Sequence, residues 1–181
     1  MAILKIARMG HPVLRRVADP VADPTAPAIR ALVADMIDTL EDIGGAGLAA
    51  PQGHVPLRVV IFRVRAERLT GDPEDVAAPM QALVNPVIEP LGEEKMLRWE
   101  GCLSVPGLRG AVPRWRRLRY TGTDLDGRPV DRVVAGYHAG LVQHEFDHLD
   151  GILYPARMTD FGYFGFNEEM AKYPPDMEAP R

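Results

Sequence analysis

The sequence predicts an α+β fold in which antiparallel strands and hairpins pack around a central helix, with a second helix in the N-terminal half. Apolar residues recur at helical spacing in two separate segments. Between these segments lie stretches that are rich in branched residues and bounded by prolines, as is typical of strands. An Asp126-Gly127 pair marks a hairpin turn, so neighbouring strands are expected to run antiparallel.

The first helix is predicted over residues 25–43. It follows an irregular segment, residues 1–24, which prolines interrupt. Thr25 is the expected N-cap, and Gly44 and Gly45 are expected to end the helix. The apolar residues at helical spacing are Ile29, Leu32, Val33, Met36, Ile37 and Leu40.

The rest of the chain alternates strands and turns before a second helix. Residues 56–64 and 81–90 predict strands, and the polar residues 66–80 between them predict a surface loop. Residues 111–135 predict two short strands around the hairpin turn. The second helix is predicted over residues 137–150.

The chain has the size and composition of one globular domain. It contains 181 residues, of which 46% are hydrophobic and 25% charged. We expect residues 1–160 to form that domain and residues 161–181 to form a tail. Residues 161–166 hold three of the five phenylalanines, so we expect this aromatic segment to dock on the domain. A contact between two copies of the chain is the alternative.

Charge and cysteine content exclude several classes of protein. Lys and Arg number 21 against 25 Asp and Glu, a net charge of −4, which argues against a protein that lives on nucleic acid or on an anionic membrane. Cys102 is the only cysteine, which excludes an intramolecular disulfide and fits a reducing compartment. No apolar run is long enough for a membrane span or a signal peptide, so we expect a cytoplasmic protein.

A cluster of arginines resembles a nucleic-acid patch. Arg114, Arg116, Arg117 and Arg119 surround Trp115. Because side chains alternate between the two faces of a strand, these arginines are expected to divide between opposite sides. We therefore expect no nucleic-acid site here.

The second predicted helix contains the motif His144-Glu145-Phe146-Asp147-His148. Residues four apart lie on one helical face, so both imidazoles can reach one metal ion. The glutamate beside the first histidine can then act on a metal-bound water. The alternative is that the two histidines only pack or cap within the helix.

A catalytic metal needs a third ligand. No histidine follows the motif, and Glu168 and Glu169 lie in the tail. Cys102 is the better candidate, because a thiolate binds divalent iron or zinc well. It lies in residues 100–104 (EGCLS), a short segment that we expect between strands. The alternative is that Cys102 is a small buried core residue.

Residues 45–52 (GAGLAAPQ) follow the first helix, so they are not the strand-to-helix loop of a dinucleotide site. Small residues would allow the backbone to approach a ligand closely, and Gln52 offers a side-chain amide. The alternative is a helix end followed by a tightly packed turn.

In this order, GxGLAAPQ, EGCLS and QHEFDH resemble the peptide deformylases, the metallohydrolases that remove the N-formyl group from nascent chains. The resemblance extends from about Ile3 to about Met158. It implies that residues 1–160 form one catalytic domain of this family, and that its central helix binds the metal. The implied enzyme is an amidohydrolase acting on linear amides.

The resemblance also implies the reaction. Its metal ligands would be Cys102, His144 and His148. A metal-bound water would attack the formyl carbon, with Glu145 as general base and then as general acid toward the leaving amine. Gln52 and the backbone N–H of Leu103 would form the oxyanion hole.

Other matching residues are implied to bind substrate or to support the site. Gly47 would bind the substrate backbone, and Arg109 would contact the substrate. The methionine pocket would include Ala46, Leu103, Gly140 and Leu141. Glu100, Arg114 and Asp147 would form a supporting polar network.

The sequence departs from the family pattern at two glycines. Gly140 replaces a larger residue within the second helix, which would either widen the methionine pocket or remove a surface contact. Gly53 replaces a branched residue after Gln52, which could loosen that loop. Neither residue is an expected metal ligand.

The implied cofactor is one divalent metal ion, Fe²⁺ in the cell, with Zn²⁺, Ni²⁺ or Co²⁺ able to replace it in preparations. The implied partners are N-formylmethionyl nascent peptides and, weakly, the ribosome, with no membrane and no nucleic-acid substrate. Two alternatives to deformylation are an HExxH metallopeptidase that cleaves ordinary peptide bonds, and an inactive peptide-binding protein on the same fold.

Overall fold

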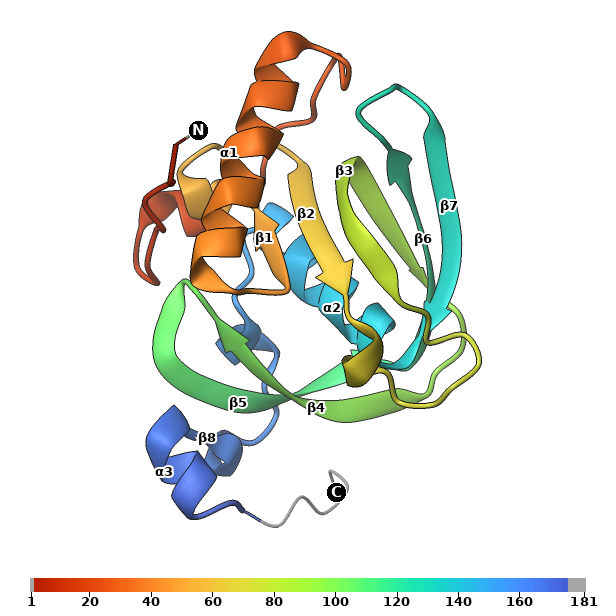
Figure 1. Ribbon diagram of the computed structural model, residues 1–181. Helices are drawn as coiled ribbons and strands as arrows, with labels where there is room; N and C mark the ends of the chain where they lie inside the picture. The colour runs from red at the N-terminus through yellow and green to blue at the C-terminus, as the bar shows by residue number, and fades with distance from the viewer. Residues whose placement is uncertain (1, 176–181) are drawn as a thin grey trace.

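The computed structural model describes residues 2–175 and contains two antiparallel sheets with a helix between them (Figure 1). The larger sheet has the strand order β1-β2-β3-β6-β7: β1 (Gly47–Ala49), β2 (Val59–Val64), β3 (Ala78–Pro90), β6 (Arg117–Thr123) and β7 (Pro129–Ala135). The smaller sheet has the order β4-β5-β8: β4 (Lys95–Cys102), β5 (Val105–Trp115) and β8 (Phe164–Phe166). This architecture confirms the predicted α+β class.

Within the described residues, three α-helices accompany the sheets: α1 (Pro27–Ile43), α2 (Gly136–Leu149) and α3 (Asn167–Lys172). The same part of the chain contains five short 3₁₀ helices: η1 (Pro12–Arg15), η2 (Ala50–Gly53), η3 (Ala66–Arg68), η4 (Tyr154–Arg157) and η5 (Phe161–Tyr163). None of the helices within residues 2–175 is long and apolar enough to cross a membrane.

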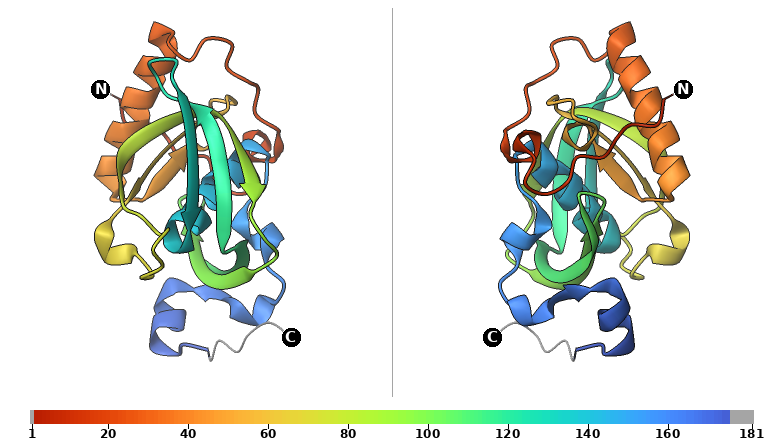
Figure 2. Two further views of the ribbon diagram at one scale, coloured as in Figure 1. Left: turned by 90° about the vertical axis from the view of Figure 1, so that its right-hand side faces the viewer. Right: turned by 90° about the vertical axis from the view of Figure 1, so that its left-hand side faces the viewer.

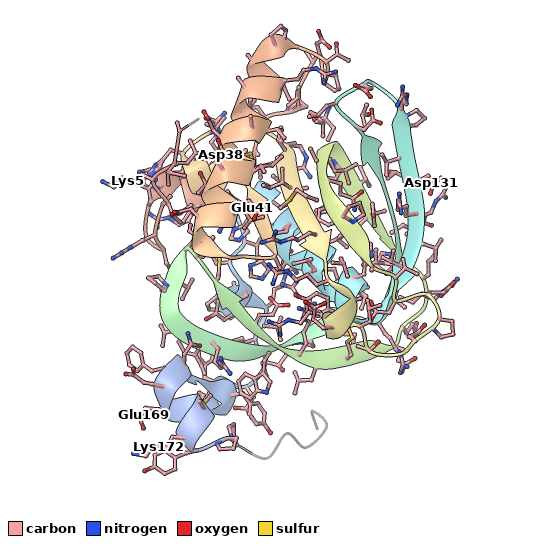
Figure 3. All side chains as sticks on the ribbon, in the orientation of Figure 1. Lys5, Asp38, Glu41, Asp131, Glu169 and Lys172 are labelled. Atoms are coloured by element: carbon pink, nitrogen blue, oxygen red, sulfur yellow. The ribbon has the colours of Figure 1, made fainter. Side chains whose placement is uncertain are left out.

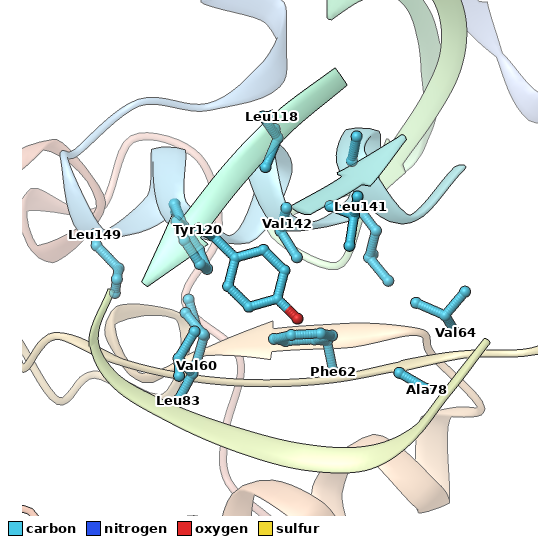
Figure 4. Close-up of a cluster of buried hydrophobic side chains, with 14 of the residues drawn as sticks. Val60, Phe62, Val64, Ala78, Leu83, Leu118, Tyr120, Leu141, Val142 and Leu149 are labelled. Carbon is cyan, nitrogen blue, oxygen red and sulfur yellow. The ribbon is translucent and has the colours of Figure 1, made fainter. Parts of the chain in front are cut away.

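Strand β2 is apolar on both faces because a helix covers each face of the larger sheet (Figure 2). Val59 and Ile61 face α1, whereas Val60 and Phe62 belong to the cluster that packs against α2. Figure 4 shows this second cluster, in which Phe62 and Tyr120 lie beside Leu141 and Val142 of α2. Charged side chains such as Lys5, Asp131 and Lys172 lie on the outside of the molecule (Figure 3).

Helix α2 is buried at thirteen of its fourteen residues, so its first N–H groups cannot rely on water. Asp75, far away in the chain, accepts hydrogen bonds from the N–H groups of Tyr137 (2.9 Å) and His138 (3.0 Å). Gly136 adopts a φ of 57°, and a Cβ there would overlap Asp75 and Thr70. A carboxylate at the positive end of the helix dipole therefore caps the helix through space.

Several sequence expectations need correction. Thr25 does not cap α1, because the N-cap is Ala26 and the Thr25 hydroxyl donates to Asp23 instead (2.7 Å). The predicted surface loop contains η3, and β3 begins within it at Ala78. Cys102 is the last residue of β4 rather than part of a separate segment between strands. The long β4–β5 hairpin was not predicted.

The aromatic tail adds an edge strand. In β8, Phe164 and Phe166 pair with Gly110 and Leu108 of β5. Phe164 also packs against the cluster around Tyr154, whereas Phe161 and Phe166 remain exposed. The tail predicted over residues 161–181 thus begins against β5, and its residues 176–181 lie outside the described part of the chain.

We predict that Asp75→Ala lowers the free energy of unfolding by about 2 kcal/mol, because it leaves buried N–H groups of α2 without an acceptor. Burial tends to raise the pKa of Asp75, but hydrogen bonds from His138, Thr70 and Tyr137 lower it below its usual 3.8. The stabilisation is therefore present above about pH 4 and is lost as the pH falls through the lowered pKa.

Urea denaturation at pH 7 and below pH 4 checks this prediction. The exposed Asp42, near the end of α1, offers a matched control, and Asp42→Ala should change the unfolding free energy by less than about 0.5 kcal/mol. Equal effects of the two substitutions would contradict a capping role for Asp75.

Candidate metal centre and active site

Cys102, His144 and His148 form the metal-binding group that the structure brings together. Cys102 ends β4, while the two histidines lie one turn apart on the buried helix α2. One possible ligand atom from each residue lies within 4.8 Å of the others. The Sγ atom of Cys102 is 3.3 Å from Nε2 of His148.

The ring of His144 is oriented by a carboxylate. Its Nδ1 lies 2.7 Å from Oε2 of Glu100, and because a carboxylate only accepts, Nδ1 must carry the proton. In the neutral ring the lone pair is therefore on Nε2, as in many metal-binding histidines. Burial alone would lower the pKa of His144, but Cys102 and Glu100 raise it well above its usual value. Tyr154 stacks on the same ring with centroids 6.2 Å apart.

His148 is buried and faces Cys102. Its Nδ1 has no hydrogen-bond partner among residues 2–175. Burial, together with the charge of His144, lowers the pKa of His148 well below its usual value and favours a neutral ring. Two imidazoles and one thiol within reach of a common point fit one divalent metal ion of the iron, nickel or zinc type.

A chain of buried charges continues behind His144. Arg114 donates to both oxygens of Glu100 (2.8 and 3.0 Å) and to Asp147 (2.6 Å). Asp147 in turn accepts two hydrogen bonds from Arg157. The three residues expected to form a supporting network are therefore in direct contact, and Arg157 extends the network to the surface.

Glu145 points into the site with an unused acceptor. The residue is 3% exposed, and its Oε2 has no hydrogen-bond partner in the described chain. Burial raises the pKa of Glu145 to about 7. Gly47 of β1 passes so close that a Cβ on this residue would overlap Glu145.

The amide of Gln52 is oriented by its neighbours. Its Oε1 accepts a hydrogen bond from the N–H of Ala49 (2.9 Å). The opposite end of the amide, Nε2, therefore faces Ser104 Oγ (3.2 Å) and Cys102 Sγ (3.5 Å). Leu103 follows Cys102 in the tight turn between β4 and β5.

A cavity of about 630 Å³ joins these groups. Most of the predicted site residues line it: Ala46, Gly47, Gln52, Glu100, Cys102, Leu103, Arg109, Leu141, His144 and Glu145. The remaining predicted residues are not among the residues that line it: Arg114, Gly140, Asp147 and His148. A second cavity, of about 670 Å³, lies against the opposite face of α2, beside Gln143 and Phe146.

Sequence reasoning missed several residues of the first cavity, among them Arg68, Arg98, Tyr137 and Asn167. Arg98 could have been found, because residues 98, 100 and 102 share one face of a strand. Asn167 accepts a hydrogen bond from Nε of Arg109 (2.9 Å), so the tail contributes to the mouth of the cavity. No local sequence signal could have placed Asn167 there.

The other histidines lie away from the metal-binding group. His138 is buried beside Tyr120 and lies 2.9 Å through Nδ1 from the carbonyl oxygen of Val76. His11 and His54 pack edge-to-face against each other near the surface.

The arginine cluster does not form a basic patch. Arg116, Arg117 and Arg119 pair with acidic side chains, respectively Glu94, Glu74 and Asp131. Arg114 is buried among its own acidic partners.

At the position of Gly53, a Cβ would meet the side chain of Leu4 at 2.9 Å. Leu4 thus occupies the space that a branched residue would take, and η2 is packed rather than loose.

Comparisons with known proteins agree with this geometry. Residues 3–162 match the family described as Polypeptide deformylase. The chain is 54% identical over 166 residues to Peptide deformylase 2 of Ralstonia nicotianae, covering 92% of this chain and 93% of that protein. It is 48% identical over 179 residues to Peptide deformylase 2 of Pseudomonas syringae, covering 97% of each.

Solved structures show the same fold. A class I type b peptide deformylase from Acinetobacter baumannii with Met-Ala-Ser bound is 34% identical, with a TM-score of 0.78 over 87% of this chain and 99% of that one. The peptide deformylase of Ehrlichia chaffeensis is 29% identical, with a TM-score of 0.81 over 90% of this chain and 91% of that one. The resemblance of the three motifs is thereby confirmed, and the chain belongs to the polypeptide deformylase family.

Proposed function

We propose that this chain removes the N-terminal formyl group from the formyl-methionine of newly made polypeptides and releases formate. The observation that carries the proposal is Glu145 Oε2, a buried carboxylate oxygen that has no hydrogen-bond partner among residues 2–175 and lies beside the Cys102, His144 and His148 group. Membership of the deformylase family supports the same reaction. In chemical class the chain is then an amidohydrolase acting on linear amides.

Cys102, His144 and His148 are the proposed ligands of one divalent ion. When bound, such an ion acts as a Lewis acid and makes water a strong nucleophile near neutral pH. The mixed thiol and imidazole donors accept iron(II), zinc, nickel and cobalt. We assign iron(II) as the native ion, and the others as substitutes in preparations.

Glu145 is the residue that transfers the proton in the proposed reaction. Its free Oε2 accepts a proton from the attacking water and then delivers it to the departing amine nitrogen. Gly47 supports this assignment, because only a residue without a Cβ leaves room for the carboxylate at this point. The backbone of Gly47 then lies where it can bind the substrate main chain.

The negative charge that develops on the formyl oxygen must be stabilised by hydrogen-bond donors. Gln52 Nε2 is held toward Cys102 by the hydrogen bond that fixes the other end of its amide. Together with the N–H of Leu103, it is the proposed oxyanion hole. Ala46, Leu103 and Leu141 would line the methionine pocket.

We propose that Arg109, whose Nε donates to Asn167, meets the substrate beyond its first residue. The proposed substrates are formylated nascent chains in the cytoplasm. A small formyl group suits a site in which the reacting groups are buried at the base of a cavity.

Glu145→Gln should lower kcat/KM about 10²–10⁴-fold, because an amide cannot take the proton. Gln52→Ala should lower kcat about 10²–10³-fold through loss of one oxyanion donor. The measurement is formate release from formyl-Met-Ala-Ser by protein whose metal content is determined before the assay.

An unformylated peptide of the same sequence serves as the control. Cleavage of its internal peptide bonds would favour a metallopeptidase. A fully metallated wild type that binds the formyl peptide without releasing formate would favour a peptide-binding protein.

Gly47→Ala should lower kcat at unchanged metal content, because the new methyl group displaces the Glu145 carboxylate. Gly53→Ala, six residues further along, meets only the flexible side chain of Leu4 and should keep kcat within about 3-fold of wild type. Steady-state kinetics with metal analysis compares the two variants. Equal losses would contradict the close approach of Gly47 to the reacting groups.

Weak ribosome association should be visible at low ionic strength and lost at about 0.2 M salt, because the exposed Arg116, Arg117 and Arg119 are paired with acidic side chains. Co-sedimentation with ribosomes measures it, with Glu145→Gln as a folded control that should behave as wild type. Absence of co-sedimentation at low salt would exclude the association but not the hydrolase activity.

A further inference from the structure

Arg98 of β4 fills the space left by Gly140 of α2. A Cβ built on Gly140 would overlap Nη1 of Arg98 and would lie 2.6 Å from its Cδ. The arginine side chain is 17% exposed, and it lines the cavity that holds Glu145 and His144. Gly140, predicted in the methionine pocket, is not among the residues that line the cavity, and Arg98 occupies its place.

Tyr137 holds one side of the Arg98 guanidinium. Its Nη1 donates to the carbonyl oxygen of Tyr137 (3.1 Å), and its Cζ lies 4.9 Å from the centre of the Tyr137 ring. Nε is 3.7 Å from Oε1 of Glu100, beyond hydrogen-bond distance. The oxygens of Glu100 already accept from Arg114 and His144.

Several N–H groups of Arg98 can therefore donate hydrogen bonds to a ligand. A guanidinium carries five N–H groups, and the described chain supplies one hydrogen-bond acceptor for them. Arginine stays charged even where burial lowers its pKa, as it does here. Ala46 and Leu141 make other parts of the cavity wall apolar, so a side chain entering it meets an apolar passage and a cationic group.

We infer that Arg98, accommodated by Gly140, is a specificity-determining residue that favours a first substrate side chain ending in a hydrogen-bond acceptor or a polarisable atom over an aliphatic chain of equal length. This inference rests on the proposed deformylase function. A methionine sulfur is polarisable and a weak acceptor, and a sulfoxide oxygen is a strong acceptor. A methylene group at the same place excludes water from these N–H groups and leaves them without a partner.

The test compares kcat/KM for formyl-Met-Ala-Ser, formyl-norleucine-Ala-Ser and formyl-methionine sulfoxide-Ala-Ser. Norleucine replaces the sulfur of methionine by a methylene group, so the ratio of the two kcat/KM values reports the effect of that one replacement. For the metallated wild type we expect methionine to be preferred over norleucine about 10-fold, as for the loss of one buried hydrogen-bond acceptor. The sulfoxide should be at least as good a substrate as norleucine.

Two variants, one in β4 and one in α2, test whether Arg98 causes this preference. Arg98→Leu should reduce the methionine-to-norleucine ratio to about 2 or less and should make the sulfoxide the poorest substrate. Gly140→Ala keeps the arginine but expels it from its place, so it should reduce the ratio as well. Because alanine favours a helix over glycine, this second variant tests the inference even if Arg98→Leu folds poorly.

Arg68→Leu is the matched control, because Arg68 is an exposed arginine that lines the same cavity. In this variant the methionine-to-norleucine ratio of kcat/KM should remain that of wild type. A ratio near 1 in the wild type would overturn the inference, as would a wild-type ratio that both Arg98→Leu and Gly140→Ala retain. A wild type that releases no formate from the methionine peptide would instead overturn the proposed function.

Discussion

The buried carboxylate of Glu100 holds the active site together. Burial would raise its pKa, but the charges and hydrogen bonds of His144 and Arg114 hold that pKa well below its usual range. A buried charge is tolerated only when it is paired and hydrogen-bonded, so β4 and α2 must meet in one relative position. Replacing Glu100, His144 or Arg114 would leave a buried charge without its partner and would lower the free energy of unfolding by about 3–5 kcal/mol. The geometry of the proposed metal ligands and the packing of α2 against β4 thus depend on the same contacts.

Helix α2 can carry so many polar residues in the interior because each of its faces has a different neighbour. One face places Leu141, Val142 and Phe146 against the larger sheet. Gln143, on the side of α2 that meets the smaller sheet, pairs with both the N–H and the carbonyl oxygen of Trp115 on β5. Fully satisfied polar contacts of this kind fix a helix more uniquely than apolar packing alone.

Local sequence signals predicted α1 and α2, and they singled out Cys102, His144 and His148, which the structure brings together. The helical spacing of His144 and His148 placed both imidazoles on one face, and α2 begins and ends within one residue of its predicted bounds. The β4–β5 hairpin was missed because glycines and prolines interrupt its alternation, as at Gly101 and Pro106. Pairings between distant residues leave no local trace. The Asp75 cap of α2 and the fit of Arg98 over Gly140 therefore needed the fold.

Cys102 has a consequence that follows from its being the only cysteine in the chain. A reagent that alkylates thiols can modify this protein at one atom only, and that atom is a proposed metal ligand. The rate of alkylation therefore reports directly on metal occupancy, since coordination withdraws the thiolate from reaction. Peroxide likewise has a single thiol to oxidise, so oxidative inactivation and loss of the third ligand would be one chemical event. The single thiol is thus a built-in mass-spectrometric reporter of the metal site, with no engineered label required.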